Sequence, residues 1–166
     1  MVKALFLDRD GTINVNYGYV FEPEKFVFVD GIFKLCRKAQ ELGYLIIVIS
    51  NQSGVSRGYY TEAQMNVCNA HMCAEFAKRG ITVTDVLTCT AADDADPDRK
   101  PNPGMFLKAI ARHGIDPAAS VAVGDSERDS AAARRAGVGT VILLDSTHTL
   151  QGVDLASIEK GEGSSR

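Results

Sequence analysis

The sequence lacks the features that direct a protein to a membrane or a nucleic acid. No apolar stretch approaches the length of a membrane span, and the N-terminal residues show neither a basic leader nor a small-residue cleavage site. The net charge is −3 and the basic residues are scattered, so no cluster of them offers itself to a nucleic-acid backbone or an anionic lipid surface. We therefore expect a cytoplasmic protein, monomeric or weakly dimeric, whose partner is a small molecule.

Cysteine is also scarce: the chain has four, without a Cys-x-x-Cys pair or the density of a disulfide-bonded secreted domain. We therefore expect reduced thiols. Cys68, His71 and Cys73 lie close together, but in a predicted helix their spacing does not place all three on one face. Because a structural zinc ion usually has four ligands in paired spacing, we interpret these residues as core residues rather than as a zinc site.

The chain is too short for two full-sized domains, although its 166 residues, 45% of them apolar, suffice for one core. We predict a single domain over residues 1–166, with its core at about residues 2–145. The apolar pattern is lost from Ser146 onward, so we expect residues 146–166 to form an appended tail with a flexible end.

Five short β-branched apolar runs alternate with helical patterns along the chain. The apolar runs are residues 2–7, 45–49, 83–87, 121–123 and 141–144, and the helical patterns are residues 32–42, 62–79, 103–113 and 127–136. The runs show little polar alternation, which is typical of strands that are covered on both faces. This order predicts an α/β fold with a doubly wound, Rossmann-like parallel sheet of five strands.

Polar residues follow several of these runs directly. Asp8 and Asp10 come after the first run, Ser50 and Asn51 after the second, and Asp125 after the fourth. Ligands of such a sheet bind beyond the carboxyl ends of its strands, so we expect these side chains to converge on one rim.

The residue types at this rim suit phosphoryl transfer. One carboxylate of Asp8-x-Asp10 can attack phosphorus while the other protonates the leaving oxygen and later activates water. Ser50 offers a hydroxyl to a phosphate oxygen, and the pair Arg99-Lys100 supplies two cations. Asp125 can complete a set of oxygen ligands for magnesium. In isolation, however, each of these motifs is also compatible with a turn or a solvated charge pair.

In this order, the motifs resemble those of the haloacid-dehalogenase-like (HAD) phosphatase superfamily over roughly residues 2–144. Within that range, residues 8–20, 26–31, 51–58 and 99–105 are similar to the heptose 1,7-bisphosphate phosphatases, with histidinol-phosphatases as the nearest relatives. The resemblance implies a capless HAD fold and a magnesium-dependent phosphomonoesterase with an aspartyl-phosphate intermediate. The implied reaction removes the C7 phosphate of D-glycero-D-manno-heptose 1,7-bisphosphate, with histidinol phosphate or another sugar phosphate as the alternative substrate.

The resemblance also implies roles for individual residues. Asp8 would be the nucleophile and a magnesium ligand, and Asp10 would be the acid/base and offer its backbone carbonyl to the metal. Asp125 would be the third ligand, supported by Asp129. The implied phosphoryl-binding residues are Ser50 and Lys100, and the implied substrate-binding residues are Asn16, Tyr17, Gly18, Tyr19, Asn51, Gln52, Ser53, Arg99 and Ser126.

The sequence departs from this family pattern at two places. Many members carry a zinc-binding loop before the Arg-Lys pair, but here Cys89 is followed by residues 90–98 with no histidine and no second cysteine. One thiol cannot hold a structural zinc, so we expect no zinc, and the loop is either ordered in another way or mobile. The second departure is Ser126, where some relatives have a lysine, a loss that would shift affinity for a second phosphate.

Two other protein classes share parts of the pattern. A haloacid dehalogenase has the same fold and nucleophile but donates no proton to an ester oxygen, so Asp10 argues against that activity. A receiver-like module, phosphorylated on aspartate but not an enzyme, fits the Asp-x-Asp-Gly-Thr order with Lys100 and Asp125 poorly. Repeated phosphate release in a turnover assay distinguishes an enzyme from such a module.

Overall fold

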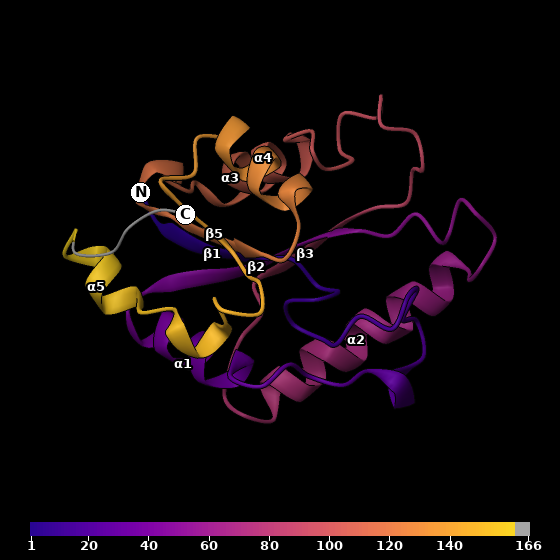
Figure 1. The fold of residues 1–166 in the computed structure, drawn as a ribbon, viewed down its shortest axis with the longest axis horizontal. Coiled ribbons are helices and arrows are strands. Elements are labelled where there is room, and N and C mark those ends of the chain that lie inside the picture. The colour runs from indigo at the N-terminus through magenta and orange to yellow at the C-terminus, as the bar shows by residue number, and fades with distance from the viewer. Residues whose placement is uncertain (162–166) are drawn as a thin grey trace.

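Five parallel strands form one sheet in the order β3-β2-β1-β4-β5 (Figure 1). The computed structural model describes residues 1–161. The strands are β1 (Lys3–Leu7), β2 (Tyr44–Asn51), β3 (Asp85–Cys89), β4 (Val121–Gly124) and β5 (Thr140–Leu143). The helices are α1 (Ile32–Glu41), α2 (Glu62–Ala77), α3 (Gly104–His113), α4 (Glu127–Arg135) and α5 (Leu155–Glu159), with 3-10 turns η1 (Pro23–Lys25), η2 (Pro117–Ala119) and η3 (Leu150–Gly152).

The predicted doubly wound, five-stranded parallel sheet is confirmed, and most element bounds agree within two residues. The largest difference is in β3, which begins and ends two residues later than its apolar run. The reason is that β2 continues to Asn51, which pairs with Cys89, so the hydrogen-bonded register carries β3 beyond the apolar residues.

Alternate residues of the central strand supply the two halves of the core. Leu5 and Leu7 pack with α1 and α2 on one face, whereas Ala4 and Phe6 pack with α3 and α4 on the other. Figure 1 shows α3 and α4 above the sheet and α1, α2 and α5 below it. The strands are therefore covered on both faces, which explains why their sequences are continuously apolar.

Residues 146–161 are not the appended tail that the sequence predicted. Leu150 and Leu155 are 3% and 1% exposed and belong to the core cluster on the α1 side of the sheet. The apolar pattern was missed because one leucine lies in a 3-10 turn and the other in a helix of only five residues, too short to show a period. The predicted flexible end, residues 162–166, lies outside the described residues.

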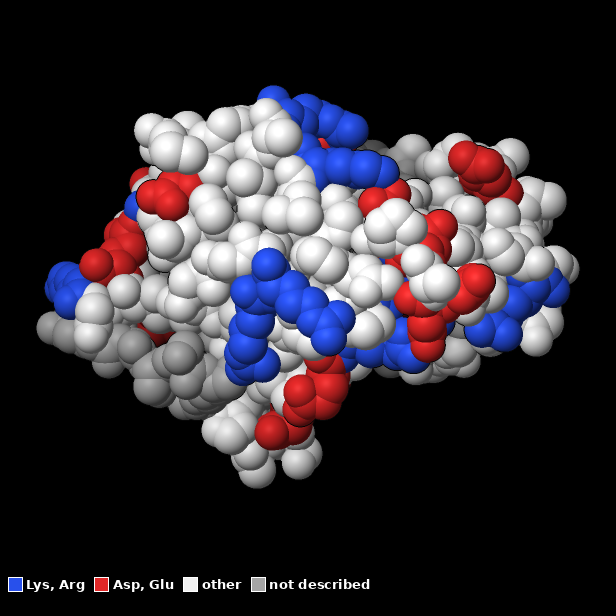
Figure 2. All heavy atoms as spheres, turned by 90° about the horizontal axis from the view of Figure 1, so that it is seen from above, with Lys and Arg blue, Asp and Glu red and all other residues white. Residues whose placement is uncertain are grey.

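The charged side chains are of both signs. On the face drawn in Figure 2, basic and acidic groups lie side by side instead of forming one extended patch of a single sign. Within residues 1–161, no helix is both long and apolar enough to cross a membrane.

The packing of the C-terminal segment leads to a stability prediction. Leu155→Ala should lower the free energy of unfolding by about 2–5 kcal/mol, because it leaves a cavity in the core. Leu107→Ala is the matched control, since Leu107 is 49% exposed on α3 and its truncation should cost roughly 0.5 kcal/mol or less. Denaturant unfolding measures both values, and equal small losses would show that the segment is only an appendage.

Candidate active site

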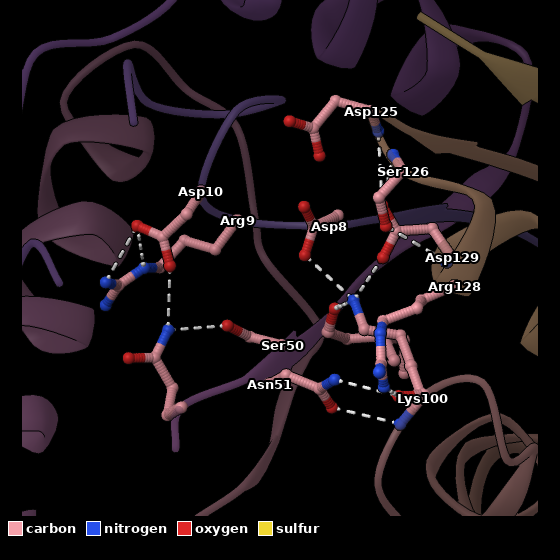
Figure 3. Close-up of polar contacts among 12 residues, drawn as sticks. Asp8, Arg9, Asp10, Ser50, Asn51, Lys100, Asp125, Ser126, Arg128 and Asp129 are labelled. Atoms are coloured by element: carbon pink, nitrogen blue, oxygen red, sulfur yellow. Dashed lines mark hydrogen bonds and ion pairs between the residues drawn. The ribbon is translucent and has the colours of Figure 1, made fainter. Parts of the chain in front are cut away.

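The site lies where the strand order reverses. The chain winds outward from β1 to β2 and β3, then returns to the other side of β1 with β4 and β5. Asp8 follows β1 and Asp125 follows β4, so these two carboxylates flank the switch point at which α/β sheets bind ligands. Ser50 at the end of β2 and Lys100 from the loop before α3 face the same region (Figure 3).

Lys100 is the centre of the polar network. Its ammonium donates to Asp8 Oδ1 at 2.8 Å and to the Ile49 carbonyl at 2.7 Å, and it lies 2.6 Å from Asp129 Oδ1. The residue is only 2% exposed. Burial alone would lower the pKa of Lys100, but the carboxylates of Asp8 and Asp129 raise it above its usual range. A permanent positive charge is therefore fixed beside the Asp8 carboxylate.

Asp129 connects this lysine to the start of α4. Its Oδ2 accepts from the backbone N–H groups of Asp125 and Ser126, both at 3.1 Å, and Ser126 is the N-cap of the helix in a reciprocal capping box. Gly124 permits this arrangement, because a Cβ at that position would lie 2.5 Å from Asp129. The side chain of Ser126, predicted to contact substrate, is thus engaged in capping α4.

Oxygen atoms of Asp8, Asp125 and Asp129 lie within 4.8 Å of one another. Those of Asp129 are already paired with Lys100 and backbone amides, which leaves Asp8 and Asp125 to hold a cation. Gly11 has a φ of +93°, and a Cβ there would lie 1.9 Å from Asp125 Oδ2, so glycine is needed for the Asp125 carboxylate to fit. This pair of hard oxygen donors fits magnesium.

Burial raises the pKa of both Asp8 and Asp125. It raises the pKa of Asp8 well above its usual range, and Lys100 opposes this shift. Burial is also the main cause of the raised pKa of Asp125, to which Asp129 adds repulsion. A bound divalent cation would favour the ionised form of both groups.

Both oxygens of the Asp10 carboxylate accept hydrogen bonds, and Figure 3 shows this carboxylate turned toward Arg9. Its Oδ1 accepts from Arg9 Nη2 at 3.0 Å and from Asn14 Nδ2 at 2.9 Å, and its Oδ2 accepts from Gln52 Nε2 at 3.0 Å. Arg9 is fully buried and also donates to Asn69 Oδ1 at 2.9 Å. Arg9 and Asn14 lie inside the family-like segment 8–20, but their residue types alone indicated no role.

Gln52 is only 2% exposed and bridges two of the predicted catalytic residues. Its Nε2 donates to Ser50 Oγ at 2.7 Å as well as to Asp10, and its Oε1 accepts from the Tyr60 hydroxyl. Asn51 is similarly engaged: its amide accepts from Lys100 N at 3.0 Å and donates to Lys100 O at 3.1 Å. These contacts place both side chains behind the reactive groups, where they hold Ser50, Asp10 and Lys100 in position.

At the rim, Tyr19 of the first segment expected to contact substrate packs against residues that follow the second, Gly54 and Tyr59. Tyr17 and Tyr19 are 65% and 48% exposed, and the ring centroids of Tyr19 and Tyr59 are 4.6 Å apart. A Cβ at Gly54 would lie 2.9 Å from Tyr19 and 2.2 Å from Tyr60, so glycine allows this close approach. Of the remaining predicted residues, Asn16 Oδ1 accepts from Gly18 N at 2.9 Å and Ser53 Oγ accepts from Arg57 Nε at 3.2 Å. No sequence pattern pointed to Tyr59 or Tyr60.

The loop that precedes Lys100 is ordered by hydrogen bonds. Asn102 Nδ2 donates to the carbonyls of Asp94 and Asp96, each at 2.8 Å. Arg99 donates from Nη1 to Ala91 O at 3.1 Å, and its Nε pairs with Asp94 Oδ1 at 2.9 Å. Of the two alternatives left open by the sequence, the structure therefore has the loop ordered in another way.

Known proteins resemble the chain over most of its length. The HAD-hydrolase-like family model matches residues 98–159. A D-glycero-alpha-D-manno-heptose-1,7-bisphosphate 7-phosphatase of Burkholderia mallei is 47% identical over 150 residues, covering 86% of this chain and 79% of the relative. The D-glycero-beta-D-manno-heptose-1,7-bisphosphate 7-phosphatase of Escherichia coli K12 is 40% identical over 151 residues, covering 86% and 79%.

A solved structure agrees with the fold. The D,D-heptose 1,7-bisphosphate phosphatase of B. bronchiseptica, in complex with magnesium and phosphate, superposes with a TM-score of 0.81 at 29% identity and covers 96% of this chain and 97% of that one. The relatives share enough identity with this chain, over enough of its length, to assign it to a family. The chain belongs to the heptose-1,7-bisphosphate 7-phosphatase family of the HAD-like hydrolases.

Proposed function

We propose that the chain is a magnesium-dependent phosphatase that converts D-glycero-D-manno-heptose 1,7-bisphosphate to the 1-phosphate. The observation that carries this proposal is the half-buried Asp8 carboxylate at the switch point, paired with Lys100 at 2.8 Å, in a chain 47% identical to a named 7-phosphatase. We further propose that residues 1–166 form one domain, active in the cytoplasm as a monomer or weak dimer.

The reaction proceeds in two steps on Asp8. Its carboxylate oxygen forms a bond to the C7 phosphorus while the bond from phosphorus to the sugar oxygen breaks, and Asp10 gives its proton to that oxygen. Water then attacks the aspartyl phosphate, Asp10 takes a proton from it, and inorganic phosphate leaves Asp8. Lys100 and the Ser50 hydroxyl stabilise the charge on the phosphoryl oxygens. Magnesium held by Asp8, Asp125 and the Asp10 carbonyl would neutralise further charge at the phosphate.

A phosphate-release panel tests the function directly. It compares both anomers of the heptose bisphosphate, because relatives named for each of them match this chain, with histidinol phosphate and other sugar phosphates. We expect one of the heptose bisphosphate anomers to give the highest kcat/KM. A preference for histidinol phosphate, or a single turnover followed by slow self-dephosphorylation, would contradict the proposal.

The metal requirement can be tested by removal and replacement. EDTA treatment should abolish phosphate release and Mg²⁺ should restore it, because Asp8 and Asp125 present hard carboxylate ligands. Zinc should be dispensable. Full activity of the metal-depleted protein, or tightly bound stoichiometric zinc in the purified protein, would contradict this prediction.

Arg99 should distinguish a bisphosphate from a monophosphate. Its planar guanidinium suits the oxygens of the phosphate that is not transferred, so Arg99→Ala should lower kcat/KM for the bisphosphate by roughly ten- to a hundredfold. An aryl monophosphate should be affected far less. Lys100→Ala should depress both substrates because it acts at the reacting phosphorus. Equal losses on both substrates for Arg99→Ala would assign Arg99 to the chemical step or the fold.

Gln52 should act through kcat and not through substrate affinity. Gln52→Ala removes the bridge between Ser50 and Asp10, so we expect kcat to fall roughly tenfold with little change in KM. Gln40→Ala is the control, since the Gln40 amide donates to Gly80 O on the surface. A raised KM with kcat unchanged would instead mean that Gln52 contacts the substrate.

A further inference from the structure

The carboxylate of Asp94 lies between two guanidinium groups. It accepts from both arms of Arg128, with Nη1 to Oδ1 at 2.9 Å and Nη2 to Oδ2 at 3.2 Å. Arg99 Nε pairs with the same Oδ1 at 2.9 Å. Two cations from separate parts of the chain, the loop before α3 and the first turn of α4, are thus turned toward one small anion.

This cluster is attached to the reaction centre through Lys100. Arg128 Nη1 also donates to the Lys100 carbonyl at 3.0 Å, while the ammonium of the same lysine pairs with Asp8 at 2.8 Å. Figure 3 shows Arg128 beside the Lys100 backbone and Asp8 at the far end of the lysine side chain. One lysine residue therefore connects the Arg128 guanidinium to the nucleophile.

The contacts of Asp94 are those that a phosphate group would make. A guanidinium fork binds a carboxylate and a phosphate with the same two-pronged geometry. The hydrogen bonds from Arg128, and next those from Arg99, lower the pKa of Asp94 to about 2, so the group is an anion at neutral pH. Its side chain is 62% exposed, so it can leave the arginines without disturbing the core.

We propose that Arg99 and Arg128 together bind the phosphate that is not transferred, and that Asp94 occupies this site until the substrate displaces it. The inference rests on the proposed function and adds two residues to it. Arg128 extends the recognition assigned to Arg99, and Asp94 is an internal competitor that lowers the affinity for every ligand with a second phosphate.

The test compares three variants on two substrates. Arg128→Ala should lower kcat/KM for the heptose bisphosphate by about tenfold more than it lowers kcat/KM for an aryl phosphate. Arg135→Ala is the matched control: Arg135 also lies on α4 and donates to a carbonyl of the same loop, Pro101 O at 2.9 Å, so its loss should change neither value. Asp94→Asn keeps the shape but removes the competing charge, and it should lower KM for the bisphosphate by about two- to fivefold.

The direction in which Asp94→Asn changes KM distinguishes competition for the two arginines from a role of Asp94 in ordering the loop. If Asp94 only ordered the loop, Asp94→Asn would raise KM for both substrates, and that result would overturn the proposal. Equal effects of Arg128→Ala and Arg135→Ala on the bisphosphate would overturn it as well.

Inhibition of aryl phosphate hydrolysis tests this inference independently of the proposed function. Heptose bisphosphate and a heptose monophosphate are compared as inhibitors, so affinity is measured whether or not the bisphosphate is hydrolysed. Stronger inhibition by the bisphosphate that is lost in Arg128→Ala, without hydrolysis of that sugar, would refute the function and leave the inference standing. Bisphosphate hydrolysis with inhibition that does not depend on Arg128 would refute only the inference.

Discussion

The site depends on the burial of the Lys100 ammonium between Asp8 and Asp129. A buried charge is costly unless it is paired and hydrogen-bonded, and here two carboxylates and the Ile49 carbonyl satisfy all three of its donors. Asn51 fixes the lysine backbone, and Asp129 is itself fixed by capping α4. The ends of β1 and β2, the start of α4 and the loop before α3 are thereby held in one geometry around a single cation.

Four aspartates share this region, and their surroundings give them different tasks. Asp8 pairs with Lys100 and lies near Asp125. Both oxygens of Asp10, in contrast, accept hydrogen bonds from side-chain donors. Asp129 is occupied by the lysine and by backbone amides. Carboxyls in such unlike environments can serve as nucleophile, acid/base, metal ligand and structural support within one site.

The sequence predicted the fold well because the fold follows from short periodic patterns. Apolar runs placed Asp8, Ser50 and Asp125 at strand ends, and the parallel sheet then brings them together. It did not predict the contacts of Gln52 and Tyr60, since a hydrogen bond between side chains depends on the path of the loop and leaves no period in the chain. The packing of Leu150 and Leu155 was missed because a 3-10 turn and a five-residue helix are too short to show a period.

Phosphate release by Asp8→Asn, measured on the bisphosphate and on an aryl phosphate, tests the central claim most directly. The amide nearly matches the carboxylate in shape but cannot form the bond to phosphorus, so turnover should fall roughly a thousandfold or more on both substrates. Unfolding by denaturant should confirm that the variant is folded. Turnover at the wild-type rate in a preparation free of contaminating phosphatase would contradict the assignment of Asp8 as the nucleophile.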